Sequence, residues 1–267
     1  MKTNFYCCYS NFKVHFYKMI YAVLILQFLF IISCTNHHHR SCSAKDQEIL
    51  RRANLKIKSC FWYEYAFKNG QIDSSTRRLY GSYYYDKYGN EILQYNFNTK
   101  GDTIFVQKTK FNSENLPVEQ TMTNLNNVVN IIKSKKAKSF FVYKDNKCIV
   151  EKMISDSYND TCFIYHEYSK NKITSKVSSE TKTFLTEQNL DIRGNIINES
   201  WYFTGKDYKD LVSYTKYNYK NKLLISEVDE KGKISIQYEY NSNGLLEKRI
   251  LNNQSGLPKM HLYQYIR

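Results

Sequence analysis

Apolar and polar residues alternate most regularly in the last quarter of the chain. Between Ile234 and Tyr240 every second residue is large, which places the large side chains on one face of an extended strand. A turn signal stands on each side of this run, at Asp229–Gly232 and at Asn241–Gly244. Asp or Asn at the first turn position hydrogen-bonds its own backbone, and Gly at the fourth supplies a positive φ, so the pattern predicts strand, tight turn, strand.

The same turn signal recurs along most of the chain. Strict copies lie at Asp86–Gly89, Asn98–Gly101, Asn112–Asn115, Asp191–Gly194, Asn218–Asn221 and Asn253–Gly256, and looser copies at Phe67–Gly70, Tyr143–Asn146 and Tyr168–Asn171. The segments between them predict strands at Leu93–Phe97, Phe140–Tyr143, Lys147–Ile154, Thr161–Tyr168, Trp201–Phe203 and Tyr214–Tyr219. This spacing predicts an all-β fold, an antiparallel meander of about ten to fourteen strands in a twisted or curled sheet.

Two stretches depart from the strand pattern. Residues 46–57 place Ile49, Ala53 and Ile57 on one stripe, which predicts a short helix. Residues 118–138 have no turn signal and carry apolar residues at helical spacing, so we expect a helix or a long excursion there. Pairs such as Val128-Val129 in the same stretch also suit a strand.

The first 33 residues have the features of an export leader. Lysines precede the apolar run Met19–Ile32, which is too short for a comfortable membrane span and has the length of a signal-peptide core. The run ends in Ile31-Ile32-Ser33-Cys34, which resembles the lipobox of bacterial lipoprotein signal peptides. The resemblance implies that Cys34 is diacylated and becomes the new N-terminus. An uncleaved anchor with Cys34 as an ordinary cysteine is the alternative.

The leader divides the chain into three parts: a signal peptide at 1–33, a polar tether at 34–45 and one β domain at 46–267. Thr35 follows the cysteine in place of Asp, and the same resemblance therefore favours the outer membrane, on its periplasmic or its surface face. His37, His38 and His39 in the tether lack the spaced partners of a structural zinc site, so we expect a solvated linker and no metal.

The hairpin unit has a family likeness. Tyr83–Ile92 and Tyr238–Leu246 resemble the YD repeats of Rhs-type proteins, whose pattern is Tyr-x-Tyr-Asp-x-x-Gly-Arg-Leu/Ile. In this chain Asp is often Asn, and the Arg is replaced by Asn90, Lys233 or Leu245. Short lipoproteins with degenerate YD-like repeats are the closer comparison. The repeats of the large relatives coil into a hollow β shell, which the residues from Cys60 onward look too few to close.

Composition agrees with a β fold. The chain has 25 Tyr and 15 Phe but only 2 Pro, a balance that suits half-buried strand positions. The formal net charge is +14, but the lysines are scattered, so we expect a solvated basic surface and no nucleic-acid partner. Cys148 and Cys162 lie on consecutive predicted strands and are the candidate disulfide, with buried thiols as the alternative.

The sequence offers few candidates for chemistry. No Gly-x-Ser-x-Gly, His-Glu-x-x-His or paired-carboxylate spacing occurs, so we expect neither an enzyme nor a cofactor. Aromatic clusters are the candidate binding residues, although such clusters more often form a core or cross-strand ladders. They are Trp62, Tyr63, Tyr65, Trp201 and Tyr202.

We therefore expect a membrane-anchored envelope lipoprotein that acts as a non-enzymatic interaction or scaffold module, with an unknown protein or glycan partner. One alternative is a periplasmic carrier of lipid or another hydrophobic ligand, with a curved sheet and residues 118–138 as its lid. The other alternative is a glycan-binding lipoprotein.

Overall fold

The computed structural model describes residues 43–68, 71–125, 136–155, 160–178, 183–204, 209–252 and 258–267. One helix and sixteen strands lie within these ranges: α2 (Ala44–Asn54), β1 (Ser59–Lys68), β2 (Gln71–Tyr85), β3 (Glu91–Phe97), β4 (Thr103–Phe111), β5 (Pro117–Asn124), β6 (Lys136–Lys144), β7 (Lys147–Ser155), β8 (Asp160–Ser169), β9 (Lys172–Ser178), β10 (Thr183–Leu190), β11 (Ile196–Thr204), β12 (Lys209–Lys220), β13 (Leu223–Asp229), β14 (Ile234–Tyr240), β15 (Leu246–Leu251) and β16 (Lys259–Ile266). The predicted all-β antiparallel meander is confirmed, with more strands than we expected.

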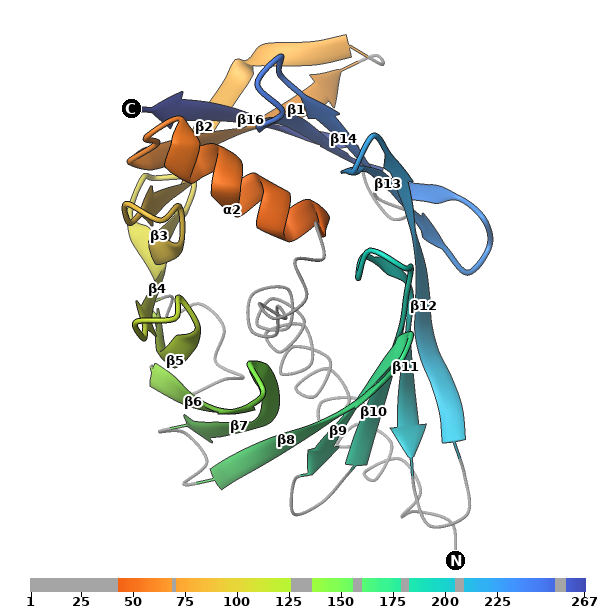
Figure 1. The fold of residues 1–267 in the computed structure, drawn as a ribbon. Helices are drawn as coiled ribbons and strands as arrows, with labels where there is room; N and C mark the ends of the chain where they lie inside the picture. The colour runs from red at the N-terminus through yellow and green to blue at the C-terminus, as the bar shows by residue number, and fades with distance from the viewer. Residues whose placement is uncertain are drawn as a thin grey trace, which may run out of the picture.

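The sheet closes into a barrel. Each strand pairs antiparallel with its neighbours in sequence, and β1 pairs with β16 from Ser59 opposite Ile266 to Ala66 opposite Lys259 (Figure 1). Closure removes both edges that an open sheet would expose. The expectation that the repeats are too few to close a shell was therefore wrong. Side chains along every strand alternate between the inner and the outer wall.

Six turns share one geometry, which Asp86 illustrates. Its Oδ1 accepts the N–H groups of Tyr88 at 2.8 Å and of Asn90 at 2.9 Å, and the N–H of Gly89 donates to its carbonyl oxygen at 3.0 Å. Gly89 has a φ of 81°, a conformation that Gly adopts at no steric cost. The same pattern occurs at Asn98, Asn112, Asp191, Asp229 and Asn241. The strict turn signal is confirmed at these positions.

Two other turns are tighter. Asp145 and Asn146 both have positive φ, as do Asn221 and Lys222, which is the geometry of two-residue hairpin turns. The turn predicted at Asn218–Asn221 therefore lies later in the chain, at Asn221 and Lys222, because Asn218 is still part of β12. The signal at Asn253–Gly256 and the end of the signal at Phe67–Gly70 lie outside the described residues.

Tyrosines next to the turns bind the preceding strand. The hydroxyl of Tyr240, the last residue of β14, donates to the carbonyl oxygen of Leu224 at the start of β13, at 2.8 Å. Tyr219 donates in the same way to Ile196 at the start of β11, at 3.0 Å. Tyr143 and Tyr168 repeat the contact in β6 and β8. The second tyrosine of the repeat therefore holds one hairpin to the one before it.

The predicted helix near 46–57 is present as α2. The side chain of Ser43 accepts a hydrogen bond from the N–H of Asp46 at 3.2 Å, which satisfies a donor of the first helical turn. Residues 118–124 and 136–138, where we expected a helix or an excursion, belong to β5 and β6. Most of the residues on which that helical spacing depends, within 126–135, lie outside the described part of the chain.

Candidate functional site

Helix α2 lies across one end of the barrel, inside the ring of strands (Figure 1). The N–H of Ala44 donates to Asn195 Oδ1 at 2.7 Å, in the turn between β10 and β11. Arg51 donates to the carbonyl oxygen of Gly244 at 3.2 Å and Arg52 to that of Gly89 at 3.0 Å. These turns belong to three separate hairpins, so α2 ties distant parts of the rim together. We call this rim the α2 end.

A carboxyl group that titrates near neutral pH lies beneath α2. Burial raises the pKa of Glu91 to about 7, although the positive charges of Arg52 and Lys45 act in the opposite direction. The Arg52 guanidinium stands 4.6 Å over the centre of the Tyr85 ring and binds Glu48 at 2.7 Å. Charged and aromatic side chains therefore make the contact between α2 and the inner wall.

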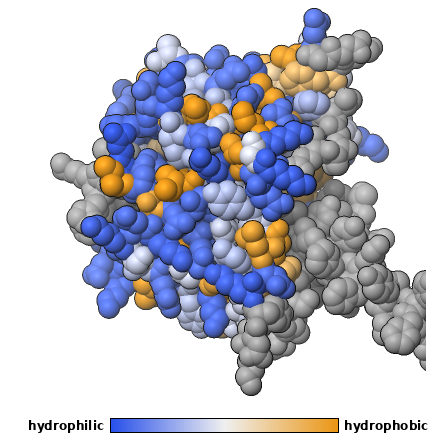
Figure 2. All heavy atoms as spheres, turned by 90° about the vertical axis from the view of Figure 1, so that its right-hand side faces the viewer, coloured by the Kyte–Doolittle hydropathy of each residue, from blue (hydrophilic) through white to orange (hydrophobic). Residues whose placement is uncertain are grey.

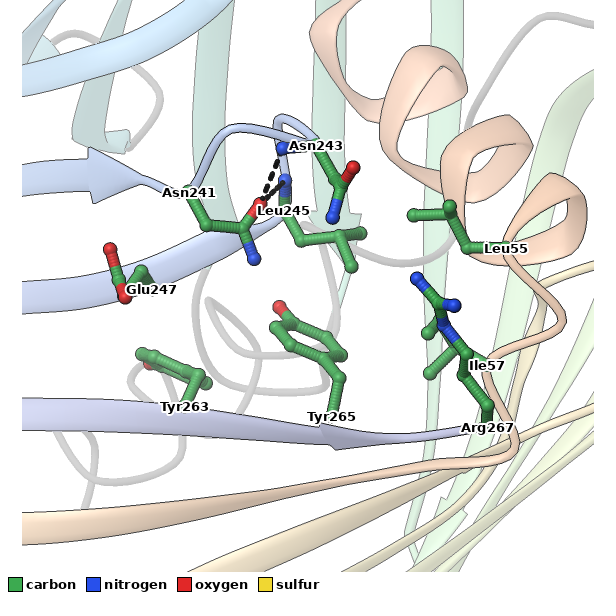
Figure 3. Close-up of a pocket in the computed structure, with 9 residues that line it drawn as sticks. All are labelled: Leu55, Ile57, Asn241, Asn243, Leu245, Glu247, Tyr263, Tyr265 and Arg267. Atoms are coloured by element: carbon green, nitrogen blue, oxygen red, sulfur yellow. Dashed lines mark hydrogen bonds between the residues drawn. The ribbon is translucent and has the colours of Figure 1, made fainter.

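A pocket of about 220 Å³ opens at the α2 end (Figure 3). Leu55 and Ile57 line it from the segment after α2, and Leu245 from the turn between β14 and β15. The side chain of Tyr265 points from β16 toward that turn. Drug-sized ligands occupy pockets of about 300–1,000 Å³, so this pocket suits one small group and is too small for a lipid chain.

A charged cluster lies deeper on the inner wall, on β1, β2 and β16. Glu64 accepts hydrogen bonds from Arg78 Nε at 2.9 Å and from Lys259 Nζ at 3.3 Å, and lies 3.4 Å from His261 Nε2. Burial acts to raise the pKa of Glu64, but the hydrogen bonds from His261 and Arg78 and the nearby positive charges outweigh it and lower the pKa to about 2. Glu64 is therefore ionised at neutral pH and compensates the cations around it.

Trp62 packs beside this cluster and is only 2% exposed. A Cβ placed on Gly81, its partner on β2, would lie 1.6 Å from the indole Nε1, so the indole contacts the Gly81 backbone directly. Its ring has four ring neighbours between 4.9 and 6.0 Å away: Tyr80, His261, Tyr83 and Tyr263. Trp62 therefore serves as packing on the inner wall.

Polar side chains line the inner wall from β3 to β10, and besides the neutral ones they include the buried Glu151 on β7 and His166 on β8. They are all 6% exposed or less, and several are direct cross-strand neighbours, such as Gln120 and Ser139 or Ser175 and Thr186. Polar side chains are rarely this buried unless they have hydrogen-bond partners. We call the neutral set the amide belt: Gln94, Gln107, Thr109, Gln120, Ser139, Ser175, Thr186 and Gln188.

The outer wall carries charge ladders. Glu119 on β5 binds Lys110 at 3.2 Å and Lys138 at 3.3 Å, on the two flanking strands. Glu187 on β10 binds Lys172 on the neighbouring β9 at 2.8 Å and Lys209 on β12, two strands away, at 3.1 Å. The face in Figure 2 is mostly hydrophilic, with hydrophobic residues in small separate groups. The outer wall is therefore a water-compatible surface with two cations for each of these carboxylates.

The structure does not gather the predicted aromatic residues into one surface. Trp62 and Trp201 face inward on strands that are well separated in the sheet, and Trp201 donates to Glu199 at 2.6 Å. Tyr63 and Tyr202 face outward by alternation and carry Arg77 and Lys209 over their rings, at 4.1 and 3.9 Å. Tyr65 is 9% exposed.

The candidate disulfide is incompatible with the strand register. Cys148 lies opposite Tyr143, whereas Cys162 lies opposite Met153, five positions further along β7. At a rise of about 3.3 Å per residue the two cysteines are about 16 Å apart along the strand. A disulfide needs Cα atoms within about 7 Å, so Cys148 and Cys162 do not form one here. Cys34 and His37–His39 lie outside the described residues.

The described ranges contain no helix long and apolar enough to cross a membrane. Within the same ranges no three His, Cys, Asp or Glu side chains gather closely enough to hold a metal ion.

Sequence reasoning missed the amide belt. Its glutamines occupy alternating positions along the strands. Polar residues on the outer face of a sheet with an apolar core would occupy alternating positions in the same way. A signal was nevertheless present, because Gln94, Gln107 and Gln120 recur at intervals of thirteen residues on successive strands.

No family model and no curated protein matches the chain. A crystal structure described as TcdB2-TccC3-Cdc42 aligns over 74% of this chain and 12% of that chain, with 11% identity and a TM-score of 0.36. Porin-like proteins from Bacteroides vulgatus and Bacteroides uniformis each align over 79% of this chain and over 98% and 96% of their own, at 12% and 10% identity. Their TM-scores are 0.44 and 0.34.

Proposed function

We propose that the chain is an envelope lipoprotein, acylated at Cys34, whose barrel acts as a non-enzymatic interaction module outside the cytoplasm. The observation that carries the proposal is the position of α2. Its first residue, Ala44, is fixed to Asn195 at the rim, so the tether from Cys34 reaches the barrel at the α2 end. The few residues between Cys34 and Ser43 span at most about 30 Å when extended, which would hold the α2 end next to the membrane surface.

The outer wall fits a barrel that stands in water beside the bilayer. Its charge ladders lie within the strands, as at Glu119 and Glu187 with their four lysines. A lysine that faces lipid near the bilayer midplane costs about 2–4 kcal/mol, and a wall with several of them would be unstable there. The acyl chains, and not the strands, would therefore provide the membrane attachment.

Labelling with radioactive palmitate tests the proposal. We expect the wild-type chain to take up label and to migrate at the mass of the cleaved form, and Cys34→Ala to lose both properties. Cys42→Ala is the matched control, because it removes a cysteine of the same segment and leaves the lipobox intact. Label that persists in Cys34→Ala would contradict the proposal.

Of the two alternatives, the polar inner wall supports glycan binding better than lipid transport. The amide belt makes this part of the inner wall polar, and a lipid chain could form no hydrogen bonds with it. The lid required for a lipid carrier was expected at 118–138, where the described residues form strands.

A further inference from the structure

We propose that the rim of the barrel at the α2 end docks onto the anionic surface of a lipid bilayer. The inference rests on the proposed membrane anchor and adds to it a second contact, made by the folded domain itself. It depends on three observations: the turns that the topology brings to this rim, the cations that these turns carry, and two large side chains exposed at their tips.

Seven hairpin turns of the described chain lie at the α2 end. Alternate turns of a closed antiparallel meander lie at the same end of the barrel. Helix α2 contacts three of them, at Gly89, Asn195 and Gly244. The turns between β4 and β5, β6 and β7, β8 and β9, and β12 and β13 therefore belong to the same rim. The segment between α2 and β1 reaches it as well, because the N–H of Lys58 donates to the carbonyl oxygen of Ile266 at the end of β16, at 2.8 Å.

Exposed positive charge is distributed around this rim. Four of the turns and the segment between α2 and β1 carry cations that are exposed to solvent. An anionic membrane surface attracts each nearby Lys or Arg and strengthens binding about fivefold per residue. The exposed cations of these segments are Lys87, Lys170, Arg193, Lys222, Lys56 and Lys58.

The carboxylates of the rim do not cancel this charge. Among the described turns at this end, Glu114 and Asp145 are the exposed acidic residues, and the exposed Lys144 precedes Asp145. The carboxylates of Asp86 and Asp191 are partly exposed and accept N–H groups of their own turns. Helix α2 adds three basic residues and two acidic ones. The rim therefore keeps an excess of positive charge.

Two large side chains project from the tips of these turns. Ile192 is 94% exposed in the turn between β10 and β11, and Tyr88 is 49% exposed in the turn between β2 and β3. Arg193 directly follows Ile192. The Lys87 ammonium lies 4.9 Å from the centre of the Tyr88 ring. An apolar or aromatic side chain beside a basic one fits the boundary between lipid headgroups and acyl chains.

The position of the tether makes a bilayer the partner that fits this rim. The proposed anchor at Cys34 lies at most about 30 Å from Ser43, next to the first residue of α2. A tether of this length holds the rim at a high effective concentration beside the membrane. A nucleic acid would attract the same cations, but it offers no apolar region to Ile192.

Tryptophan fluorescence of the full chain in lipid vesicles tests the proposal. Trp62 and Trp201 are 2% and 3% exposed, so Ile192→Trp adds a separate signal at the rim. In vesicles that contain phosphatidylglycerol, we expect lipids brominated in their acyl chains to quench about half of this added fluorescence. Vesicles of phosphatidylcholine alone, or a salt concentration of about 1 M, should reduce the quenching at least about twofold, because each weakens the electrostatic attraction.

Matched variants at the other end of the barrel are the controls. Lys231→Trp should escape quenching, because Lys231 is exposed in the turn between β13 and β14. Reversing two rim charges, with Lys87→Glu and Lys170→Glu, should reduce the quenching of Ile192→Trp at least about twofold. The pair Lys231→Glu and Lys233→Glu makes the same change in net charge at the other end and should leave the quenching unchanged.

Equal quenching of Ile192→Trp and Lys231→Trp would overturn the proposal. Quenching that changes neither with lipid charge nor with the reversal of the rim charges would overturn it as well. Tyr88→Trp replaces Ile192→Trp if the latter does not melt like wild type, because Tyr88 lies at another tip of the same rim.

Failure of the rim contact is distinguishable from failure of the lipoprotein proposal. Flotation of the chain with the vesicles measures anchoring, and palmitate labelling measures acylation of Cys34. A labelled chain that floats without quenching leaves the lipoprotein proposal intact and overturns the rim contact. A chain that takes up no label but is anchored by an uncleaved leader enters the membrane before the same helix, so its quenching still tests the rim.

Discussion

The indole of Trp62 lies against the backbone of Gly81, its partner on the neighbouring strand. Gly81 lies within β2, away from the turns, and its role is to leave room for the indole. We predict that Gly81→Ala lowers the free energy of unfolding by about 1–3 kcal/mol, because the new Cβ overlaps the indole ring. Urea unfolding measures the loss.

A double mutant separates this contact from an effect on the strand itself. Trp62→Phe removes the part of the ring that lies nearest to Gly81. In a Trp62→Phe background the additional cost of Gly81→Ala should therefore fall well below its cost in wild type. Strictly additive losses would show that the indole is not the cause.

The tyrosine hydroxyl next to the turn should contribute to stability. Tyr240→Phe removes the hydrogen bond to the carbonyl oxygen of Leu224 and leaves that carbonyl without this donor. We expect a loss of about 1 kcal/mol in the free energy of unfolding. Tyr165→Phe is the control, since Tyr165 is 45% exposed on the outer wall. An equal loss in both variants would refute a special role for Tyr240.

Glu91 should make stability depend on pH. Its pKa is about 7 in the folded chain, against an ordinary value of 4.5 for a glutamate carboxyl group in water, so the folded state holds the proton more tightly. The stabilisation of the protonated form is complete below about pH 4.5 and is lost as the pH rises toward 7. The loss is at most about 3 kcal/mol.

Urea unfolding at pH 5 and pH 8 measures this effect. Glu91→Gln, which cannot titrate, should show a smaller fall in stability over that interval than wild type. Parallel pH profiles of the two proteins would exclude Glu91 as the titrating group.

Alanine substitutions at two turn glycines distinguish the cost of backbone strain from the cost of a clash with α2. Gly89 and Gly101 have φ values of 81° and 86°, so alanine is strained at both. A Cβ on Gly89 would lie 2.2 Å from the carbonyl oxygen of Ile49 in α2, whereas a Cβ on Gly101 meets nothing within 4 Å. We predict that Gly89→Ala costs at least about 1 kcal/mol more than Gly101→Ala in thermal unfolding. Equal costs would mean that α2 does not rest on this turn.

The local hairpins could be predicted from the sequence because their determinants are local. Asp86 and the residues after it contain all of the turn chemistry, since one carboxylate oxygen accepts N–H groups two and four residues on. Closure could not be predicted in this way. Ser59 and Ile266 lie at opposite ends of the domain sequence, and neither strand carries a signal that specifies the other.

The polar inner wall could not be predicted, for a different reason. Alternation shows which residues share a face, but it does not show which face points inward. In β3 and β5 the inward face carries Gln94 and Gln120, which a search for an apolar core assigns to the surface. The disulfide prediction failed because a position on consecutive strands does not make two residues neighbours. Whether Cys148 lies beside Cys162 depends on the register, which is set by where the turn between the strands begins.

Pairing of β1 with β16 also constrains the order of folding. The first strand of the barrel has no partner on that side until the last strand has been synthesised, so the ring is completed late, by the contact of longest sequence separation. The same pairing brings the two ends of the barrel sequence together. A short linker could join them, and new termini cut between Asp145 and Asn146 would leave every strand pair in place.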